Sequence, residues 1–152
     1  MTVEQGAFEI VRRLAAPPAR VFRAWADPDR KRRWHTCHAD WRTEVHELDL
    51  RVGGAERNRV VEPDGTVHAM EARYFDVVPD RRLVYAYAMD VGGVRISVSL
   101  AAVTFHPDGG GTRMVFAEQV TFLDGHGDLA DRRRGTELGL DALEAWLGAE
   151  GA

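Results

Sequence analysis

Turn-forming residues divide residues 42–122 into six segments, each of a length typical of a β-strand. The turns lie at Gly53–Gly54, Pro63–Gly65, Pro79–Asp80, Gly92–Gly93 and Pro107–Gly111. Because glycine, proline and aspartate end strands and form tight connections, this spacing predicts a β-meander. The expected strands cover about 43–50, 55–62, 66–78, 82–90, 94–106 and 112–122. A further strand is expected at 7–14, where Phe8 and Ile10 share one face.

Three helices are expected around these strands. Pro17–Pro18 and Asp27–Pro28 each predict a helix start, so two short helices follow the first strand, the second at about 28–34. Residues 128–149 predict one long helix, whose stripe at i, i+4, i+7 and i+11 is Thr136, Leu140, Leu143 and Leu147. We interpret Gly135 and Gly139 in this helix as positions of close approach to a sheet. The order predicts an α+β fold with a curved, seven-stranded antiparallel sheet wrapped around the last helix.

Alternation within the strands predicts which side chains share a face. Two faces are clear, one along 83–89 and one along 114–122; their members are Leu83, Tyr85, Tyr87 and Met89, and Met114, Phe116, Glu118, Val120 and Phe122. In residues 94–106 the apolar positions run from Val94 to Leu100 and then change parity at Val103. A β-bulge near Ala101–Ala102 would absorb that shift.

Composition narrows the function classes. The formal net charge of -4 disfavours a general nucleic-acid binder, and no apolar run reaches the roughly 20 residues of a membrane span. The single cysteine, Cys37, forms no internal disulfide, and Met1–Gly6 lacks the regions of a signal peptide. We therefore expect a cytoplasmic protein whose residues 1–152 form one domain. The excess of arginine over the single lysine, Lys31, is interpreted as codon bias.

Several segments together resemble the START-type (SRPBCC) helix-grip superfamily and, within it, the family of activator of heat-shock-protein-90 ATPase homologues. The resemblance covers about residues 7–148 and rests on segments 16–25, 27–28, 49–54, 78–85 and 110–114, with Trp34 and the pattern of Gly135, Leu140, Leu143 and Leu147. The chain departs from the family in two places. Family members commonly have two tryptophans where this chain has only Trp34. They also have a C-terminal Gly-Trp pair, and the corresponding residues here are Gly135 and Thr136.

The resemblance implies a cavity between the concave sheet and the long helix, in which apolar small molecules bind. If the Gly53–Gly54 turn sets the register as in the family, Glu56, Asn58 and Val60 point inward. The implied ligand-binding residues are Trp34, Glu56, Asn58, Tyr85, Tyr87, Phe116, Glu118 and Leu140. A one-residue slip would instead place Glu56 and Glu118 in solvent beside arginines. A carboxylate desolvated in the cavity would have a raised pKa and could act as an acid or base.

Other candidate sites carry weaker signals. His35, Cys37, His38 and Asp40 are possible metal ligands, but the spacing matches no metal motif, so we expect a polar loop held by Trp34 and Trp41 at the cavity mouth. Arg30–Arg33 and Arg132–Arg134 are interpreted as solvated helix faces paired with acidic residues. Phosphate loops and nucleophile motifs are absent from the sequence, and no metal or cofactor is predicted.

The sequence thus favours a small-molecule binding protein over an enzyme, with an apolar or aromatic ligand as the partner. One alternative is a cyclase- or hydrolase-type enzyme that uses a cavity carboxylate. The other, implied by the family name, is a protein module that acts on a chaperone ATPase. An exposed edge strand would also allow a homodimer.

Overall fold

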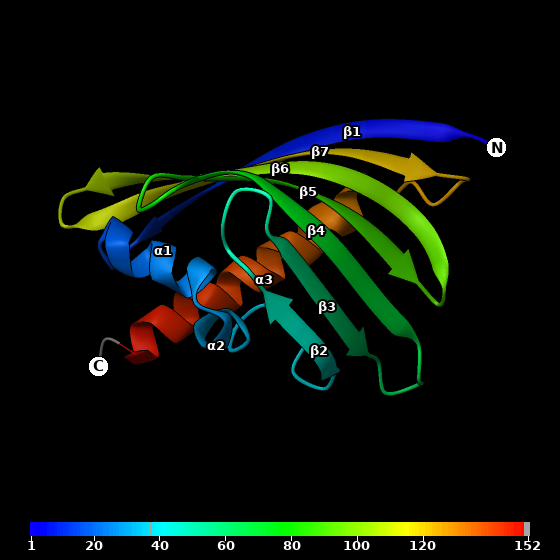
Figure 1. Ribbon diagram of the computed structural model, residues 1–152, viewed down its shortest axis with the longest axis horizontal. Helices are drawn as coiled ribbons and strands as arrows, with labels where there is room; N and C mark the ends of the chain where they lie inside the picture. Colours follow the sequence, from blue (N-terminus) through cyan, green and yellow to red (C-terminus); the bar gives the residue numbers. More distant parts are fainter. Residues whose placement is uncertain (37, 151–152) are drawn as a thin grey trace.

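The computed structural model describes residues 1–36 and 38–150 and shows an α+β fold, in which a seven-stranded antiparallel sheet arches over a long helix (Figure 1). The sheet has the order β1-β7-β6-β5-β4-β3-β2. Its strands are β1 (Val3–Leu14), β2 (Arg42–Leu48), β3 (Ala55–Val61), β4 (Val67–Val78), β5 (Arg82–Val91), β6 (Val94–Asp108) and β7 (Gly111–Leu123). The fold class and the seven strands expected from the sequence are therefore confirmed.

The helices are α1 (Pro18–Ala26), α2 (Pro28–Lys31) and α3 (Leu129–Glu150). Asp27 caps α2 by accepting hydrogen bonds from the backbone of Asp29 and Arg30, so the Asp-Pro signal acts as expected. The second helix ends at Lys31, three residues earlier than predicted. None of the helices in the described ranges is long and apolar enough to cross a bilayer.

The long helix α3 leans toward one edge of the sheet. Its backbone approaches β1 and α1, and Arg12 on β1 donates to the Asp141 carboxylate at 2.7 Å. Arg20 on α1 donates to the backbone carbonyl of Leu147 near the C-terminal end of α3. These two hydrogen bonds hold α3 to β1 and to α1. Elsewhere α3 lies over the inner face of the sheet, and its backbone makes no comparable contact with β3 or β4.

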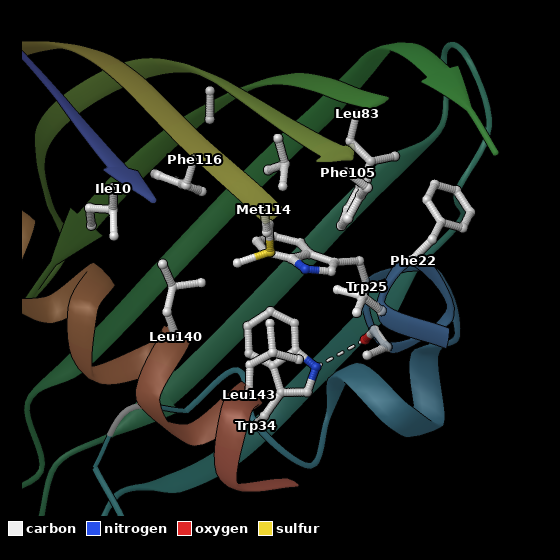
Figure 2. Close-up of a cluster of buried hydrophobic side chains, with 14 of the residues drawn as sticks. Ile10, Phe22, Trp25, Trp34, Leu83, Phe105, Met114, Phe116, Leu140 and Leu143 are labelled. Carbon is white, nitrogen blue, oxygen red and sulfur yellow. Dashed lines mark hydrogen bonds between the residues drawn. The ribbon is translucent and has the colours of Figure 1, made fainter. Parts of the chain in front are cut away.

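The hydrophobic core lies between α3, α1 and the middle of the sheet (Figure 2). Trp25 and Trp34 pack edge to face with ring centroids 4.8 Å apart, and Leu143 is fully buried. The indole nitrogen of Trp34 donates to the Ala24 carbonyl at 2.9 Å, the bond drawn in Figure 2. These side chains fill the end of the fold at which α1 and the C-terminal half of α3 meet the sheet.

Strand β6 differs from the sequence prediction in the face that it buries. Ser97 and Ser99 point inward and are buried, whereas Val98 and Leu100 are 45% and 46% exposed on the outer face. The inward parity continues unbroken through Ala101, so the bulge expected near Ala101–Ala102 is wrong. The irregularity in the pairing of β5 with β6 lies instead between Met89 and Asp90. The apolar pattern misled the prediction because polar partners inside the fold hold the two serines.

Close packing of the backbone explains one glycine of the turn between β2 and β3. A Cβ atom built on Gly54 would lie 1.9 Å from the carbonyl oxygen of Asp49, so only glycine fits there. This turn positions the start of β3, and Glu56 follows it by two residues. The close contact at Gly54 is therefore a local reason for the expected register of β3, in which Glu56 points inward.

Candidate functional site

Polar side chains on the inner face of the sheet form two separate buried clusters. Of the residues predicted to contact a ligand, Glu56, Tyr85, Tyr87 and Glu118 are buried on this face, and Asn58 is half-buried beside them. The inward register expected for β3, β5 and β7 is therefore present, and the alternative with both carboxylates in solvent is wrong. One cluster surrounds Glu118 and the other surrounds Glu56.

In the first cluster, three donors hold one oxygen of Glu118. Its Oε2 accepts from the Tyr87 hydroxyl at 2.8 Å, from Ser99 Oγ at 2.9 Å and from Arg132 Nη1 at 3.2 Å. Arg132 lies in the first turn of α3 and also donates to Ser97. The other oxygen, Oε1, is buried and accepts no hydrogen bond from any described residue. Glu118 therefore keeps one oriented acceptor position that the surrounding side chains do not use.

In the second cluster, Lys31 forms a buried ion pair with Glu56. Lys31 Nζ lies 2.6 Å from Oε1, which also accepts from the Tyr74 hydroxyl at 2.7 Å. The other oxygen of Glu56 lies 3.0 Å from His46 Nε2. Lys31 and Glu56 are 5% and 1% exposed, so both charges are withdrawn from water and each depends on the other.

The environment of Glu56 keeps it ionised. Burial alone would raise the pKa of this carboxyl, but the Lys31 ammonium and the hydrogen bonds from His46, Lys31 and Tyr74 outweigh burial and lower the pKa to about 2. The sequence-based expectation of a raised pKa is therefore wrong for Glu56. A carboxylate that holds no proton near neutral pH cannot act as a general acid.

A pair of histidines lies beside the second cluster. The rings of His35 and His46 stack with centroids 4.5 Å apart, and His35 Nε2 lies 3.1 Å from the side-chain oxygen of Asn58. Burial, the neighbouring His46 and the Lys31 ammonium lower the pKa of His35 to about 4. His35 is therefore neutral at pH 7.

Three predicted ligand contacts belong to the hydrophobic core. Trp34, Phe116 and Leu140 are 4%, 4% and 2% exposed, and the polar atom of Trp34 is used within the core. Trp34 thus packs inside the fold, whereas the sequence placed it at a cavity mouth. Trp41 lies in the loop just before β2, and its ring contacts the rings of His38 and His68.

The sequence analysis missed the cations of both clusters. Lys31 and Arg132 belong to the two charge runs that we interpreted as solvated faces, yet each run supplies one inward residue that pairs with a buried carboxylate. Two signals could have identified them. Lys31 is the only lysine among 20 basic residues, and Arg132 lies four residues before Thr136, so it extends the inward stripe of α3 by one turn.

The glycines of α3 leave open space. A Cβ atom built on Gly135 or Gly139 would meet no atom within 4 Å outside its own helix and chain neighbours. The expected close approach of helix and sheet is therefore wrong. Gly139 follows Arg132 by seven residues, which is two helical turns, so it lies about 10 Å further along the same side of the helix. That side is turned toward β5, β6 and β7, because Arg132 bonds there to Tyr87, Ser99 and Glu118.

Replacing Gly139 with alanine is expected to stabilise the protein by about 0.5–1 kcal/mol, because alanine has the higher helix propensity and its methyl group meets no obstacle. Urea denaturation of the two proteins measures the difference. The contrasting variant Gly54→Ala should be clearly destabilised, since its methyl group would overlap the Asp49 carbonyl oxygen. A Gly139→Ala protein that is less stable than the wild type would show that the space is filled.

Two hollows of about 600 and 430 Å³ lie on the outer face of the sheet. They share Ala7, Leu100 and Gln119, and most of their lining residues are small or apolar. The sequence led us to expect a cavity on the opposite, inner face. These outer hollows follow from the reversed face of β6, which places Val98 and Leu100 outside.

Within the described ranges, no three histidine, cysteine, aspartate or glutamate side chains form a group that could hold a metal ion. Cys37, one of the four candidate ligands named from the sequence, lies outside the described residues. His38 contacts the Trp41 ring, and His35 bonds to Asn58 and to the backbone of Lys31.

Comparisons with known proteins identify close relatives of the chain. A family model described as Activator of Hsp90 ATPase homolog 1-like protein matches residues 15–148. A putative uncharacterized protein from Rhizobium leguminosarum is 51% identical, with a TM-score of 0.93 and 97% of each chain covered. A protein from Rhizobium loti is 36% identical, with a TM-score of 0.88 and 96% of this chain and 99% of that chain covered. No curated protein matches the sequence.

An AHSA1-like protein from Aeromonas hydrophila shares the fold at 24% identity. Its TM-score is 0.74, and the match covers 96% of this chain and 94% of the other.

Proposed function

This chain belongs to the family of Activator of Hsp90 ATPase homolog 1-like proteins, and we propose that it binds a small, largely apolar molecule between α3 and the inner face of the sheet. The observation that carries the proposal is the open space beside Gly139, on the side of α3 that is turned toward β5, β6 and β7. Gly139 is only partly exposed, so the open space beside it lies against the protein, and open space on a partly apolar face favours a ligand site.

The side chains expected around this space suit such a ligand. Met70 and Met89 are direct cross-strand partners on β4 and β5, and both are only partly buried against the core. Methionine side chains are flexible and polarisable, so they adapt to flat apolar molecules. Tyr85 and Tyr87 continue the same face of β5 and add aromatic surface.

The two polar clusters would form the ends of the site. Glu118 with Arg132 lies near the start of α3, whereas Glu56 on β3 pairs with Lys31 at the end of α2. Asn58, half-buried and bonded to His35, would be a further contact. The acid–base enzyme alternative loses one of its two carboxylates, because the pKa of Glu56 is about 2.

Filling the space from the helix side tests the proposal. The fluorescent probe 1-aminoanthracene is small, neutral and aromatic, and we expect it to bind to the wild-type protein. The variant Gly139→Leu should weaken that binding by about tenfold or more, which corresponds to 1.4 kcal/mol, because leucine occupies the volume that the probe needs.

Gly148→Leu is the matched control, since Gly148 is an exposed glycine of the same helix with the same open surroundings. It should bind the probe as tightly as the wild type does. Melting temperatures of both variants check that the fold is retained. Equal affinity of the two leucine variants, or no binding to the wild type, would contradict the proposed site.

A further inference from the structure

On the inner face, one polar group of β7 and one of β5 make no hydrogen bond to the described residues. The first is Oε1 of Glu118, whose other oxygen accepts three hydrogen bonds. The second is the hydroxyl of Tyr85, a residue that is only 7% exposed and makes no side-chain hydrogen bond to the described chain, whereas Tyr74 and Tyr87 both donate to a carboxylate. Oε1 of Glu118 is buried, and an unmade hydrogen bond on a buried group costs free energy, so this oxygen calls for a partner.

The two groups lie in the same row across the sheet. Tyr85 on β5 pairs with Ala101 on β6, which pairs with Glu118 on β7. Two strand spacings separate Tyr85 from Glu118 by roughly 10 Å between Cα atoms. Both side chains are long, and the residue between them carries only a methyl group. No bulky side chain of β6 therefore separates Tyr85 from Glu118 in this row.

The chemistry of the two groups restricts what that polar group is. Glu118 Oε1 only accepts a hydrogen bond as a carboxylate oxygen, so the ligand has to donate to it. Burial, with Tyr87 and the carboxylates of Glu118 and Glu56 nearby, raises the pKa of Tyr85 well above its usual value, so this phenol keeps its proton and can donate. One hydroxyl group can donate to Glu118 and accept from Tyr85 at the same time.

The charges on the inner face favour a neutral ligand. Glu118 has Arg132 as its cation, and Glu56 has Lys31. His35 is neutral at pH 7, since its pKa is about 4. Each buried carboxylate is thus already matched by its own cation, and a charged ligand would bring an uncompensated charge out of water, which is costly.

We infer that the ligand is a neutral, largely apolar molecule with a hydroxyl group, and that this hydroxyl donates to Glu118 Oε1 and accepts from Tyr85. This assignment rests on the proposed binding site between α3 and the sheet. It excludes carboxylic acids, which are anionic at neutral pH, and ranks ethers and hydrocarbons of the same shape below the alcohol.

Displacement of 1-aminoanthracene by a matched naphthalene series tests the inference. The series consists of 2-naphthol, 2-methylnaphthalene, 2-methoxynaphthalene and 2-naphthoate, which share a ring system and differ in the polar group. We expect 2-naphthol to bind about tenfold or more tightly than the methyl and methoxy compounds, and 2-naphthoate to bind weakest.

The variant Tyr85→Phe separates a ligand contact from a structural role. Because the hydroxyl has no hydrogen-bond partner among residues 1–36 and 38–150, its removal should leave the melting temperature unchanged or slightly higher. The affinity for 2-naphthol should fall severalfold, while the affinity for 2-methylnaphthalene stays the same. A structural role would instead lower the melting temperature and weaken both compounds equally.

The outcomes distinguish the two proposals. If 1-aminoanthracene does not bind to the wild-type protein, the binding site itself is wrong. If the probe binds but 2-naphthol shows no preference over 2-methylnaphthalene, or 2-naphthoate binds more tightly, the site stands and the hydroxyl assignment is overturned. Unchanged affinity of Tyr85→Phe for 2-naphthol would overturn the assignment as well.

Discussion

Replacing Lys31 with methionine is expected to lower the free energy of unfolding by about 3–5 kcal/mol, because it leaves Glu56 buried with an uncompensated charge. Methionine keeps most of the length of the lysine side chain, so the loss of packing is small. For a chain of this size the melting temperature should fall by roughly 10 °C. Urea denaturation and thermal melting followed by circular dichroism measure both quantities.

Arg32→Met is the matched control, since it removes a neighbouring cation from the same charge run. Arg32 is exposed and pairs with Asp29 at the surface, so its loss should change stability by no more than about 0.5 kcal/mol. The double variant Lys31→Met/Glu56→Gln should recover part of the lost stability, because the buried charge is gone and the amide can still bond to Tyr74. Equal effects of Lys31→Met and Arg32→Met would refute the structural role of the ion pair.

Acidification is expected to destabilise the protein in two separate steps. His35 has a pKa of about 4 in the folded state and about 6.5 when unfolded, so the unfolded chain takes up its proton first as the pH falls. Stability should therefore decline between about pH 6.5 and 4, by on the order of 2–3 kcal/mol. Glu56, with a folded pKa of about 2 against 4.5, stabilises the fold above pH 4.5, and that contribution is lost as the pH falls toward 2.

Urea denaturation at unit steps from pH 8 to pH 3 measures the first step directly. In the variant His35→Gln the decline between pH 6.5 and 4 should largely disappear, while the loss below pH 4.5 remains. His126→Gln, which changes an exposed histidine in the connection before α3, should keep the wild-type profile. A wild-type profile that is flat between pH 7 and 4 would contradict the assigned neutral, buried state of His35.

The strand boundaries could be predicted because their signals are local. Gly53–Gly54, Pro79–Asp80 and Gly92–Gly93 each end a strand through their own backbone preferences, and the structure places turns at all three. Likewise, Asp27 caps α2 through atoms within three residues of it. Such features need no knowledge of the rest of the chain.

The incorrect predictions concern features that depend on residues distant in the sequence. Ser97 and Ser99 face inward, where Ser97 accepts a hydrogen bond from Arg132 on α3 and Ser99 donates one to Glu118 on β7. A prediction from the spacing of apolar residues does not include such partners, because they are distant in the sequence. The open space beside Gly139 likewise depends on where α3 lies, and Arg12 on β1 contacts this helix from a distant part of the chain through Asp141.

The sequence by itself determined the order of the elements and the antiparallel sheet around a long helix, whereas the structure settled that Glu56 and Glu118 point inward. The order and the sheet follow from turn chemistry and side-chain periodicity, which act over a few residues. Only the tertiary structure decided which cation meets each carboxylate. Lys31 lies 25 residues before Glu56, and Arg132 lies 14 residues after Glu118. Charge pairing depends on distance in space, so a run of like charges does not show which of its members meets a given carboxylate.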